Sequence, residues 1–364
     1  RLRKIVVMET KGLRSFAAEA RRLIATFDEV EQMGAVAGNP ALIDEALARQ
    51  TLDDVGLMIY TSGSTGKPKG AMISYRNIRG VVPGIVERLR LTQETSHLSY
   101  LPLCHVAEQM LTTFVPLYTG SQVNFGESIR TVQEDLREVA PTMFLGVPLV
   151  EVYGLTESTG MVTGHPIDEV IVGTVGTPIH GVEWRIGEAG EFQIRGDMVF
   201  AGYYKNPEAT ATSIRDGWLH TGDVVREEGG QLKIVDRLKD IMITAGGKNL
   251  TPSEIENTMK GSPYIKECVI VAEGRKFVGA LVMIDFETVG KWAEAQRIPF
   301  THFRSLVEHP KVRELIEADI AQGNQRLAQV SQIRKFHLLT KELDHDDGEV
   351  TATMKVRRSS IYKT

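Results

Sequence analysis

The sequence predicts an α/β protein with a large N-terminal domain of mostly parallel sheets that includes a β-rich part, followed by a smaller α+β C-terminal domain. Two observations carry this prediction. In the first half of the chain, short apolar runs alternate with helix-like stretches, as in strands joined by crossover helices. From about residue 173 to 235, turn residues separate short strand-like segments. We place the boundary so that the domains are 1–237 and 238–364.

The elements of the first domain follow its apolar runs. Strands are expected at Ile5–Met8, Gly56–Tyr60, Ala71–Ser74 and Thr142–Val147. Helices are expected at Arg14–Thr26, Asn77–Leu91 and Thr131–Val139. In the β-rich part, strands are expected at Gly181–Ile186, Glu191–Arg195 and Gln231–Val235.

The second domain is expected to begin with a helix, Thr251–Lys260. Thr251 is a suitable N-cap, Pro252 suits the first helical position, and Glu254 follows three residues after the cap. The remaining predicted elements are strands at Ile265–Ala272 and Phe277–Ile284 and a long helix over about Pro310–Leu327.

The bulk composition excludes several classes of protein. A chain of 364 residues can bury a sizeable core, and its net charge of −5 gives no global basic field for nucleic acid. Only two cysteines, Cys104 and Cys268, are present, which favours a reducing, cytoplasmic location. No apolar run approaches the roughly 18 residues of a membrane span. Because the sequence does not begin with Met, we expect it to start inside a domain.

A loop rich in small residues lies between two apolar runs at residues 61–70, and it is the most informative segment. Small residues let a backbone approach a ligand, and amides, hydroxyls and lysines suit a polyphosphate. Pro68 follows Gly-Lys, so the loop is not a Walker A motif, and strand, loop, strand is the expected structure. A flexible surface turn is the alternative. The candidate nucleotide-binding residues are Thr61, Ser62, Gly63, Ser64, Thr65, Gly66, Lys67 and Lys69.

A second segment, Tyr153-Gly154-Leu155-Thr156-Glu157, can complement that loop. A tyrosine before a glycine turn can present its flat face to a base, and a hydroxyl and a carboxylate close behind can meet a phosphate and Mg²⁺. Alone, the segment is also typical of a turn into a helix.

Together these two segments resemble the signature of the adenylate-forming (AMP-binding) superfamily, and the chain as a whole is most similar to bacterial long-chain fatty-acid–CoA ligases. The resemblance implies that Tyr153, with Gly154, contacts adenine. It also implies that Thr156 contacts phosphate and that Glu157 holds Mg²⁺, and it makes Thr156 and Glu157 catalytic together with Lys355. It further implies that the C-terminal domain is mobile.

Other motifs receive roles from the same resemblance. Asp223, at the end of Trp218-Leu219-His220-Thr221-Gly222-Asp223, would accept hydrogen bonds from the ribose hydroxyls, although an Asp after Gly is also a common turn residue. Arg237 would contact the nucleotide, and Lys239 would be the hinge. His105 would lie beside the acyl pocket. Its neighbour Cys104 is expected to be a small buried side chain rather than a nucleophile.

The end of the chain, Val350–Arg358, resembles the terminal motif of the long-chain ligases. In that motif Lys355 is the adenylation lysine, although Met354 stands where most of the superfamily has Gly. The CoA path would follow Gly246, Gly247 and Lys248. Without the resemblance, the basic end could be a solvated tail or could attract anionic lipid weakly, giving peripheral membrane contact.

These roles imply two-step activation of a fatty acid: ATP gives acyl-AMP and pyrophosphate, and CoA then displaces AMP. The small-molecule partners are a fatty acid, ATP and CoA, with Mg²⁺ as the metal and no nucleic acid. The alternatives are another ligase of the superfamily, such as an aryl-acid ligase or an adenylation domain, and a non-catalytic nucleotide-binding homologue. The sequence leaves chain length and oligomeric state open.

One junction in the sequence conflicts with a continuous fold. Phe144–Pro148 and Leu149–Val152 resemble two strands that are well separated in relatives, yet here they adjoin. Parallel strands need a crossover of about a dozen residues or more. We therefore expect that residues are omitted near 147–150, and that the large domain is incomplete.

Overall fold

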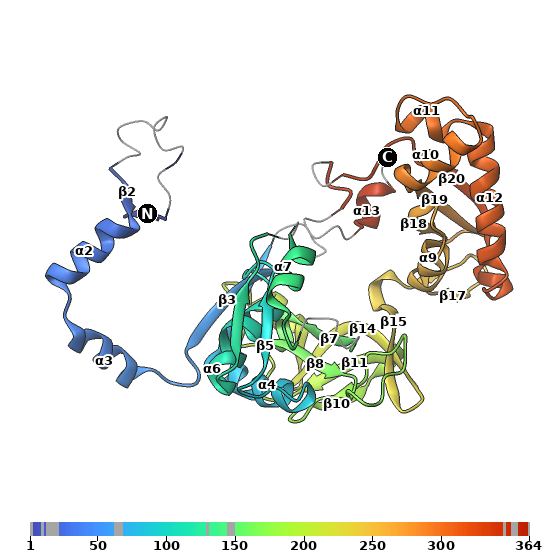
Figure 1. Cartoon of the computed structure of the whole chain (residues 1–364). Coiled ribbons are helices and arrows are strands. Elements are labelled where there is room, and N and C mark those ends of the chain that lie inside the picture. The colour runs from blue at the N-terminus through green and yellow to red at the C-terminus, as the bar shows by residue number, and fades with distance from the viewer. Residues whose placement is uncertain are drawn as a thin grey trace. The chain divides into compact units, whose positions relative to one another are not determined.

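The computed structural model describes residues 3–8, 11, 22–61, 68–128, 131–143, 150–344, 347–350 and 356–362 (Figure 1). Contacts divide the chain into two units, Arg1–Asp54 and Val55–Thr364. In the described residues, no helix is long and apolar enough to cross a membrane.

The first unit contains two short parallel strands and two helices. Strand β1 (Ile5–Val7) pairs with β2 (Ile24–Thr26), and helices α2 (Phe27–Ala37) and α3 (Pro40–Arg49) follow. The helix predicted over Arg14–Thr26 is therefore wrong at its end. Thr26 is the N-cap of α2 and forms a capping box with Glu29, so the helix begins one residue later. Residues 12–21 lie outside the described part of the chain.

The second unit begins with a hairpin around the loop of small residues. Strand β3 (Val55–Thr61) pairs antiparallel with β4 (Lys69–Ser74), which confirms the predicted strand, loop, strand. The short strand β12 (Gly202–Tyr203) joins the other edge of β4. Helix α4 (Tyr75–Arg88) starts directly after β4, where Ser74 caps its first turn.

A second sheet in this unit is parallel. Strand β5 (Ser96–Ser99) pairs with β6 (Gln122–Phe125), and Met143 forms a parallel bridge to His97 of β5. Of the strand predicted over Thr142–Val147, residues 144–147 lie outside the described part. The helical elements around this sheet are α5 (Val106–Gln109), the π-helix η2 (Met110–Phe114), α6 (Val115–Thr119) and α7 (Val132–Val139).

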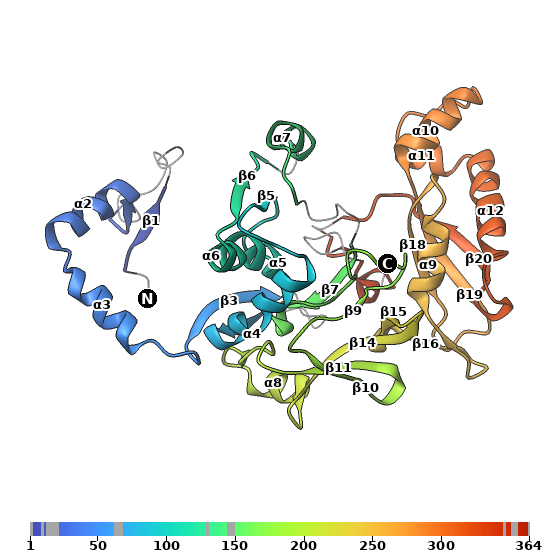
Figure 2. The same ribbon diagram turned by 60° about the horizontal axis from the view of Figure 1, so that its bottom comes forward.

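The β-rich part contains a five-stranded and a three-stranded antiparallel sheet. Figure 2 shows β10, β11 and β14 of the larger sheet side by side. The larger sheet consists of β10 (Glu183–Ile186), β11 (Glu191–Arg195), β13 (Ile214–Arg215), β14 (Trp218–Glu228) and β15 (Gln231–Arg237). The smaller sheet consists of β7 (Val152–Leu155), β8 (Gly160–Gly164) and β9 (Thr177–Pro178). Helix α8 (Pro207–Ser213) and the 3-10 turns η3 (Thr156–Ser158) and η4 (Glu188–Gly190) lie between the strands.

After the 3-10 turn η5 (Leu238–Asp240), the chain forms the three-stranded sheet β18–β19–β20, and helices lie alongside this sheet. Figures 1 and 2 show α9 and α12 alongside it. The strands are β16 (Met242–Ile243), β17 (Asn249–Leu250), β18 (Ile265–Val271), β19 (Val278–Ile284) and β20 (Ile333–Leu338). The helical elements are α9 (Pro252–Lys260), α10 (Phe286–Ala295), α11 (Phe303–Val307), α12 (Pro310–Asn324), η6 (Gln329–Ser331) and α13 (Arg358–Ile361). Thr251 occupies the N-cap position of α9, but its side chain makes no capping hydrogen bond.

The α/β fold class is confirmed, with the strand directions now defined. Among described strands before residue 238, β1–β2 and β5–β6 are parallel and the other pairs are antiparallel, which corrects the expectation of mostly parallel sheets in the described part. One buried cluster draws on residues from Ile59 to Leu232 and another on residues from Met242 to Leu338. A domain boundary at 237/238 stays a prediction.

Candidate active site

Three strands of two different sheets bring three of the predicted nucleotide-binding residues together. Tyr153 of β7 donates a hydrogen bond of 2.5 Å from its hydroxyl to Oδ2 of Asp223, which lies in β14. Arg237, at the end of β15, places Nε 2.7 Å from Oδ1 of the same carboxylate. Asp223 is only 3% exposed, so a phenol and a guanidinium compensate a buried charge. Asp223 lies directly opposite Arg237 in the β14–β15 register, which explains their proximity.

Electrostatics keeps the Tyr153 phenol in its neutral, donating form. Burial raises the pKa of Tyr153 well above its ordinary value, and the adjacent Asp223 carboxylate raises this pKa further. The ring of Tyr153 also makes an edge contact with Phe192, with the centroids 6.0 Å apart. The position of Tyr153 is therefore fixed at both its polar and its apolar end.

A second group of residues includes Glu157, the predicted metal ligand. Its Oε1 accepts a 2.5 Å hydrogen bond from the hydroxyl of Tyr203, and the Nζ of Lys69 lies 5.1 Å from the centroid of the Tyr203 ring. The strand register explains the grouping, because β12 pairs Tyr203 with Ala71, two residues beyond Lys69 on β4. Burial raises the pKa of Tyr203, and the neighbouring Glu157 raises it further.

Tyr203 was not predicted as a site residue. Its segment in the sequence, Gly202–Thr210, indicates no role for the tyrosine. Of the predicted phosphate loop, Thr61 pairs with Lys69 in the hairpin, whereas Ser62, Gly63, Ser64, Thr65, Gly66 and Lys67 lie outside the described residues.

Glu191 holds the turn that leads into Asp223. Its Oε1 accepts a hydrogen bond from the Gly222 amide at 3.0 Å, and its Oε2 lies 2.6 Å from Nδ1 of His220. The next residue in this turn, Thr221, donates to the carbonyl of Phe192 at 2.6 Å. These contacts bind the turn to β11, and they fix the backbone on both sides of Gly222.

The Glu191 contacts predict a pH dependence of stability. Burial acts to raise the pKa of Glu191, but hydrogen bonds from His220, Gln193 and the Gly222 amide together lower it below its ordinary value of 4.5. A carboxyl with a lowered folded-state pKa adds stability that is present above its unfolded pKa and is lost as pH falls through the folded one.

We therefore expect E191Q to flatten the decline of the thermal unfolding midpoint as pH is lowered from about 5 to 3. The measurement is thermal unfolding of both proteins across that range. E188Q, which changes an exposed carboxylate nearby, is the matched control. An equally steep decline in E191Q and wild type contradicts the assignment.

The remaining predicted residues lie apart from these two groups, or outside the described residues. His105 is exposed, and its Nδ1 caps α5 by accepting from the Ala107 amide at 3.2 Å. Cys104 is exposed, so the expectation of a buried side chain is wrong. Residues 246–248 form the turn between β16 and β17, where Gly247 has a φ of 73° that favours glycine. Lys355 lies outside the described residues.

The 3-10 turn η3 also contains Thr156, directly before Glu157, and Gly154 lies two residues earlier in β7. A side chain at Gly154 would collide with the backbone, because an added Cβ would lie 1.7 Å from the carbonyl oxygen of Gly160. Glycine is therefore required at this position by the antiparallel pairing of β7 with β8.

The residues present fit a magnesium ion that is bound mainly by its substrate. Glu157 Oε2 accepts no hydrogen bond from the described residues, so it has a lone pair to offer a cation. Within the described ranges, no three His, Cys, Asp or Glu residues are grouped as a metal cage. A single carboxylate suits Mg²⁺, which usually completes its coordination with phosphates and water.

The sequence matches two profiles of one enzyme family. The AMP-binding enzyme profile matches residues 6–150, and the profile of the AMP-binding enzyme C-terminal domain matches residues 239–364. A long-chain fatty-acid–CoA ligase of Mycobacterium bovis, FadD15, is 27% identical, and the match covers 92% of this chain and 72% of the relative. A feruloyl-CoA synthase of Amycolatopsis is 30% identical over 60% of this chain and 57% of the relative.

Solved structures share the fold. The O-succinylbenzoate coenzyme A synthetase of Bacillus subtilis, in complex with ATP and a magnesium ion, superimposes with a TM-score of 0.69 at 19% identity. The match covers 95% of this chain and 77% of that one.

The alignment with the M. bovis enzyme also bears on the predicted junction. It extends over 431 positions, more than the 364 residues of this chain, so the relative has residues within the aligned span that this chain lacks. The match to the first family profile ends at residue 150. Residues 144–149 are outside the described part, so an omission near 147–150 stays a prediction.

Proposed function

The chain belongs to the adenylate-forming, AMP-binding family of acid–CoA ligases, and we propose that its acid substrate is a long-chain fatty acid. The observation that carries the proposal is the likeness to the M. bovis long-chain ligase, which extends over 92% of this chain. The reaction would convert the acid and ATP to acyl-AMP and pyrophosphate, and CoA would then displace AMP to give the thioester.

The arrangement of Tyr153, Asp223 and Arg237 supports nucleotide binding. In our proposal the Asp223 carboxylate, which only accepts hydrogen bonds, receives the two ribose hydroxyls. The ring of Tyr153 contacts adenine, next to Gly154, and Arg237 adds a positive charge beside the nucleotide. The existing bonds from Tyr153 and Arg237 to Asp223 hold the carboxylate in place before the nucleotide arrives.

Neutralisation of charge is the main chemical demand of the first step, because a carboxylate must approach a polyphosphate. In our proposal Thr61, Lys67, Lys69 and the amides of the 61–70 loop hold the phosphates, with Thr156 beside them. Glu157 holds Mg²⁺, which supplies positive charge at the phosphate oxygens. Lys355 bridges the acid and the α-phosphate.

In the second step the CoA thiol attacks the acyl-AMP, so Lys355 must first leave the place that the thiol then occupies. We propose that residues 238–364 turn about Lys239 and admit CoA along Gly246, Gly247 and Lys248. His105 is proposed to lie beside the acyl chain.

Two other functions compete with this one. An aryl-acid substrate is favoured by the 30% identity to a feruloyl-CoA synthase, although that match covers less of this chain. A non-catalytic nucleotide-binding homologue is the alternative of a different class. Against it, the chain contains Glu157, Asp223 and Arg237, and their geometry suits a nucleotide.

Exchange of labelled pyrophosphate into ATP tests the proposal. We expect exchange that depends on a fatty acid, and AMP release that further requires CoA. A panel of straight-chain acids from short to long, with ferulic acid included, identifies the substrate. Exchange with ferulic acid alone overturns the fatty-acid assignment, and an absence of exchange with every acid overturns the catalytic one.

The hinge proposal gives a prediction at Lys239. This exposed residue lies in η5, and none of the turn, loop and cap hydrogen bonds in the described chain uses its amide, so proline removes none of those bonds. Proline fixes φ, and a rotation at this residue is then blocked. We expect K239P to separate the half-reactions: pyrophosphate exchange persists, while thioester formation falls.

The measurement compares both half-reactions in K239P, with K239A as the matched control that keeps backbone freedom. Normal overall turnover in K239P shows that the hinge lies elsewhere.

A further inference from the structure

We propose that Tyr203 is a positioning residue that separates Lys69 from Glu157, leaving the cation for phosphate and one carboxylate oxygen for the metal. This inference rests on the proposed function and assigns a role to a residue that the sequence motifs did not identify. It is carried by the contacts of Tyr203 on its hydroxyl, its ring face and its backbone.

The hydroxyl of Tyr203 determines how Glu157 presents its charge. It donates to Oε1 at 2.5 Å, and no described residue donates to Oε2. One oxygen of the carboxylate is therefore occupied by a neutral donor, and the other is left for a cation. A tyrosine hydroxyl is an uncharged hydrogen-bond donor near neutral pH, so this contact leaves the negative charge of the carboxylate available to a cation.

The ring of Tyr203 determines the position of Lys69. The ammonium of Lys69 lies 5.1 Å from the centroid of the Tyr203 ring, within the range of a cation–π contact. In the described part of the chain, Lys69 forms no ion pair with a carboxylate. A direct Lys69–Glu157 pair would reduce the charge that each could offer to a phosphate or a metal. The aromatic ring provides a weaker, neutral contact instead.

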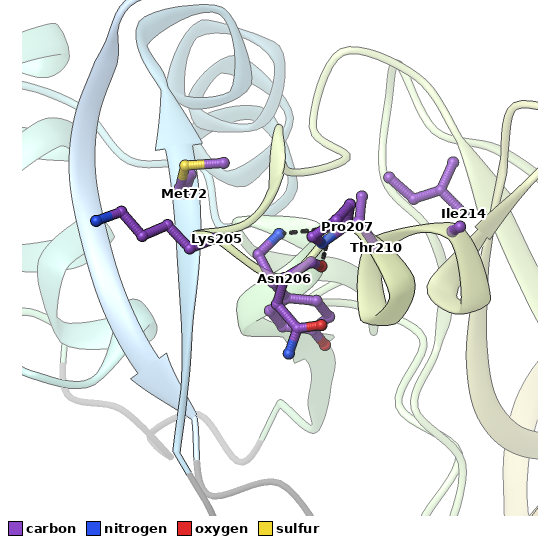
Figure 3. Close-up of a pocket in the computed structure, with 8 residues that line it drawn as sticks. Met72, Lys205, Asn206, Pro207, Thr210 and Ile214 are labelled. Carbon is purple, nitrogen blue, oxygen red and sulfur yellow. Dashed lines mark hydrogen bonds between the residues drawn. The ribbon is translucent and has the colours of Figure 1, made fainter.

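The backbone of Tyr203 is held rigidly enough to serve this purpose. Its amide donates to Oγ1 of Thr210 at 2.9 Å, and the Thr210 hydroxyl donates to the carbonyl of Asn206 at 3.0 Å. Figure 3 shows Asn206 and Thr210 lining a surface pocket with Met72, Lys205, Pro207 and Ile214. Asn206 also caps α8 by accepting from the Ala209 amide at 3.1 Å. The edge of the Tyr203 ring contacts Phe200, with the centroids 4.8 Å apart.

This pocket is apolar, and among the described residues that line it Lys205 is the one with a charged side chain. Beside the pocket, hydrogen bonds through Thr210 and Asn206 hold the backbone of Tyr203 next to α8. The hydroxyl of Tyr203 donates to Glu157 instead.

Replacement of Tyr203 by phenylalanine tests the hydroxyl with the smallest change of shape. The probe is ATP binding measured by calorimetry over a range of Mg²⁺ concentrations, without acid or CoA. We expect Y203F to raise the Mg²⁺ concentration for half-maximal binding about tenfold, the loss expected for one hydrogen bond to a charged group. The matched control is Y204F, since Tyr204 is the adjacent tyrosine and is 46% exposed.

A double-mutant cycle shows whether Tyr203 acts through Glu157. In an E157Q background, Y203F is expected to shift the Mg²⁺ dependence no further. Additive shifts, or a Mg²⁺ dependence in Y203F equal to that of Y204F, overturn the proposal. Thermal unfolding shows whether every variant is folded. If Y203F is unstable, T210V replaces it, because this substitution removes the hydrogen bond from the Tyr203 amide to Thr210. T210V is expected to raise the Mg²⁺ concentration for half-maximal ATP binding, as Y203F does.

The outcome is separable from that of the proposed function. ATP binding and its Mg²⁺ dependence are measured without the acid substrate, so they report on Tyr203 even if the acid is wrongly identified. Fatty-acid-dependent exchange in wild type with an unshifted Y203F rejects the role of Tyr203 alone.

Discussion

Replacement of Lys355 by alanine is expected to slow acyl-AMP formation by at least about 100-fold, comparable with the loss of one pre-organised donor at a developing charge. In our proposal Lys355 contacts both anions, and it does so only during adenylation. Transfer of the acyl group from supplied acyl-AMP to CoA should therefore continue in K355A. The two half-reactions are measured separately, by pyrophosphate exchange and by thioester formation.

The adjacent basic residue supplies the control for this experiment. Arg357 is exposed and lies two residues further along the chain, so R357A removes a positive charge from the same segment without removing the proposed bridge. We expect R357A to retain most of the exchange activity. Equal loss of both half-reactions in K355A, or equal loss of exchange in K355A and R357A, contradicts the role of Lys355.

Local patterns allowed the sequence to predict many of the elements. The two strands β3 and β4 were expected because Pro68 and Gly70 disfavour a helix directly after the loop, although their antiparallel pairing was not expected. Helix α9 was expected because Pro252 follows a capping residue. The Tyr153 motif and Asp223 were expected to serve one nucleotide, and the structure brings them into contact. Helix α2 was missed even though Thr26 and Glu29 have capping-box spacing, because the preceding apolar stretch was interpreted as helix.

Contacts between residues that are far apart in the sequence could not be predicted from local sequence patterns. Tyr203 meets Glu157 across 46 positions, and Glu191 meets the Gly222 amide across 31 positions. Nothing local to either residue indicates such a partner, because the pairing depends on which strands become neighbours. The same reason explains the strand directions. An apolar run predicts a strand, but only its partner decides whether it is parallel.

A buried ion pair in the C-terminal part gives the largest expected effect on stability. Nη2 of Arg358 lies 2.5 Å from Oε2 of Glu256, and the side chains are 16% and 10% exposed. Oε1 of Glu256 accepts from the Ile270 amide at 2.9 Å. The hydroxyl of Tyr362, the C-cap of α13, donates to the Ile270 carbonyl at 2.5 Å. The α13 segment is therefore joined to β18 directly through Tyr362 and indirectly through Glu256 of α9.

Removal of one partner leaves the other charge buried. We expect R358M to lower the free energy of unfolding by about 3–5 kcal/mol, the range for breaking a buried pair on one side. In the double variant R358M/E256Q most of this loss should be recovered, because Gln is neutral and can still accept from the Ile270 amide. R304M, which makes the same substitution at an arginine whose side chain and partner Glu308 are both exposed, is the matched control.

The measurement must report on this part of the chain alone. Trp292 packs against the buried cluster of residues from Met242 to Leu338, whereas Trp184 and Trp218 lie in the β-rich part. In a W184F/W218F background, denaturant unfolding followed by tryptophan fluorescence therefore reports on the core around Trp292. A loss for R358M no larger than that for R304M contradicts the prediction.

The pH dependence provides a second, independent check on the same pair. Burial raises the pKa of Glu256, while the Arg358 charge and the Ile270 amide act to lower it. Without Arg358 this pKa should rise further. A carboxyl with a raised folded-state pKa destabilises the fold only at pH values at which it is ionised. The deficit of R358M should therefore be full at neutral pH and shrink as pH falls and Glu256 becomes protonated. The contrary outcome is a loss of unfolding free energy in R358M that stays constant from pH 7 to about pH 5 while R358M/E256Q recovers stability. That outcome would mean that the loss comes from lost packing and not from an uncompensated carboxylate.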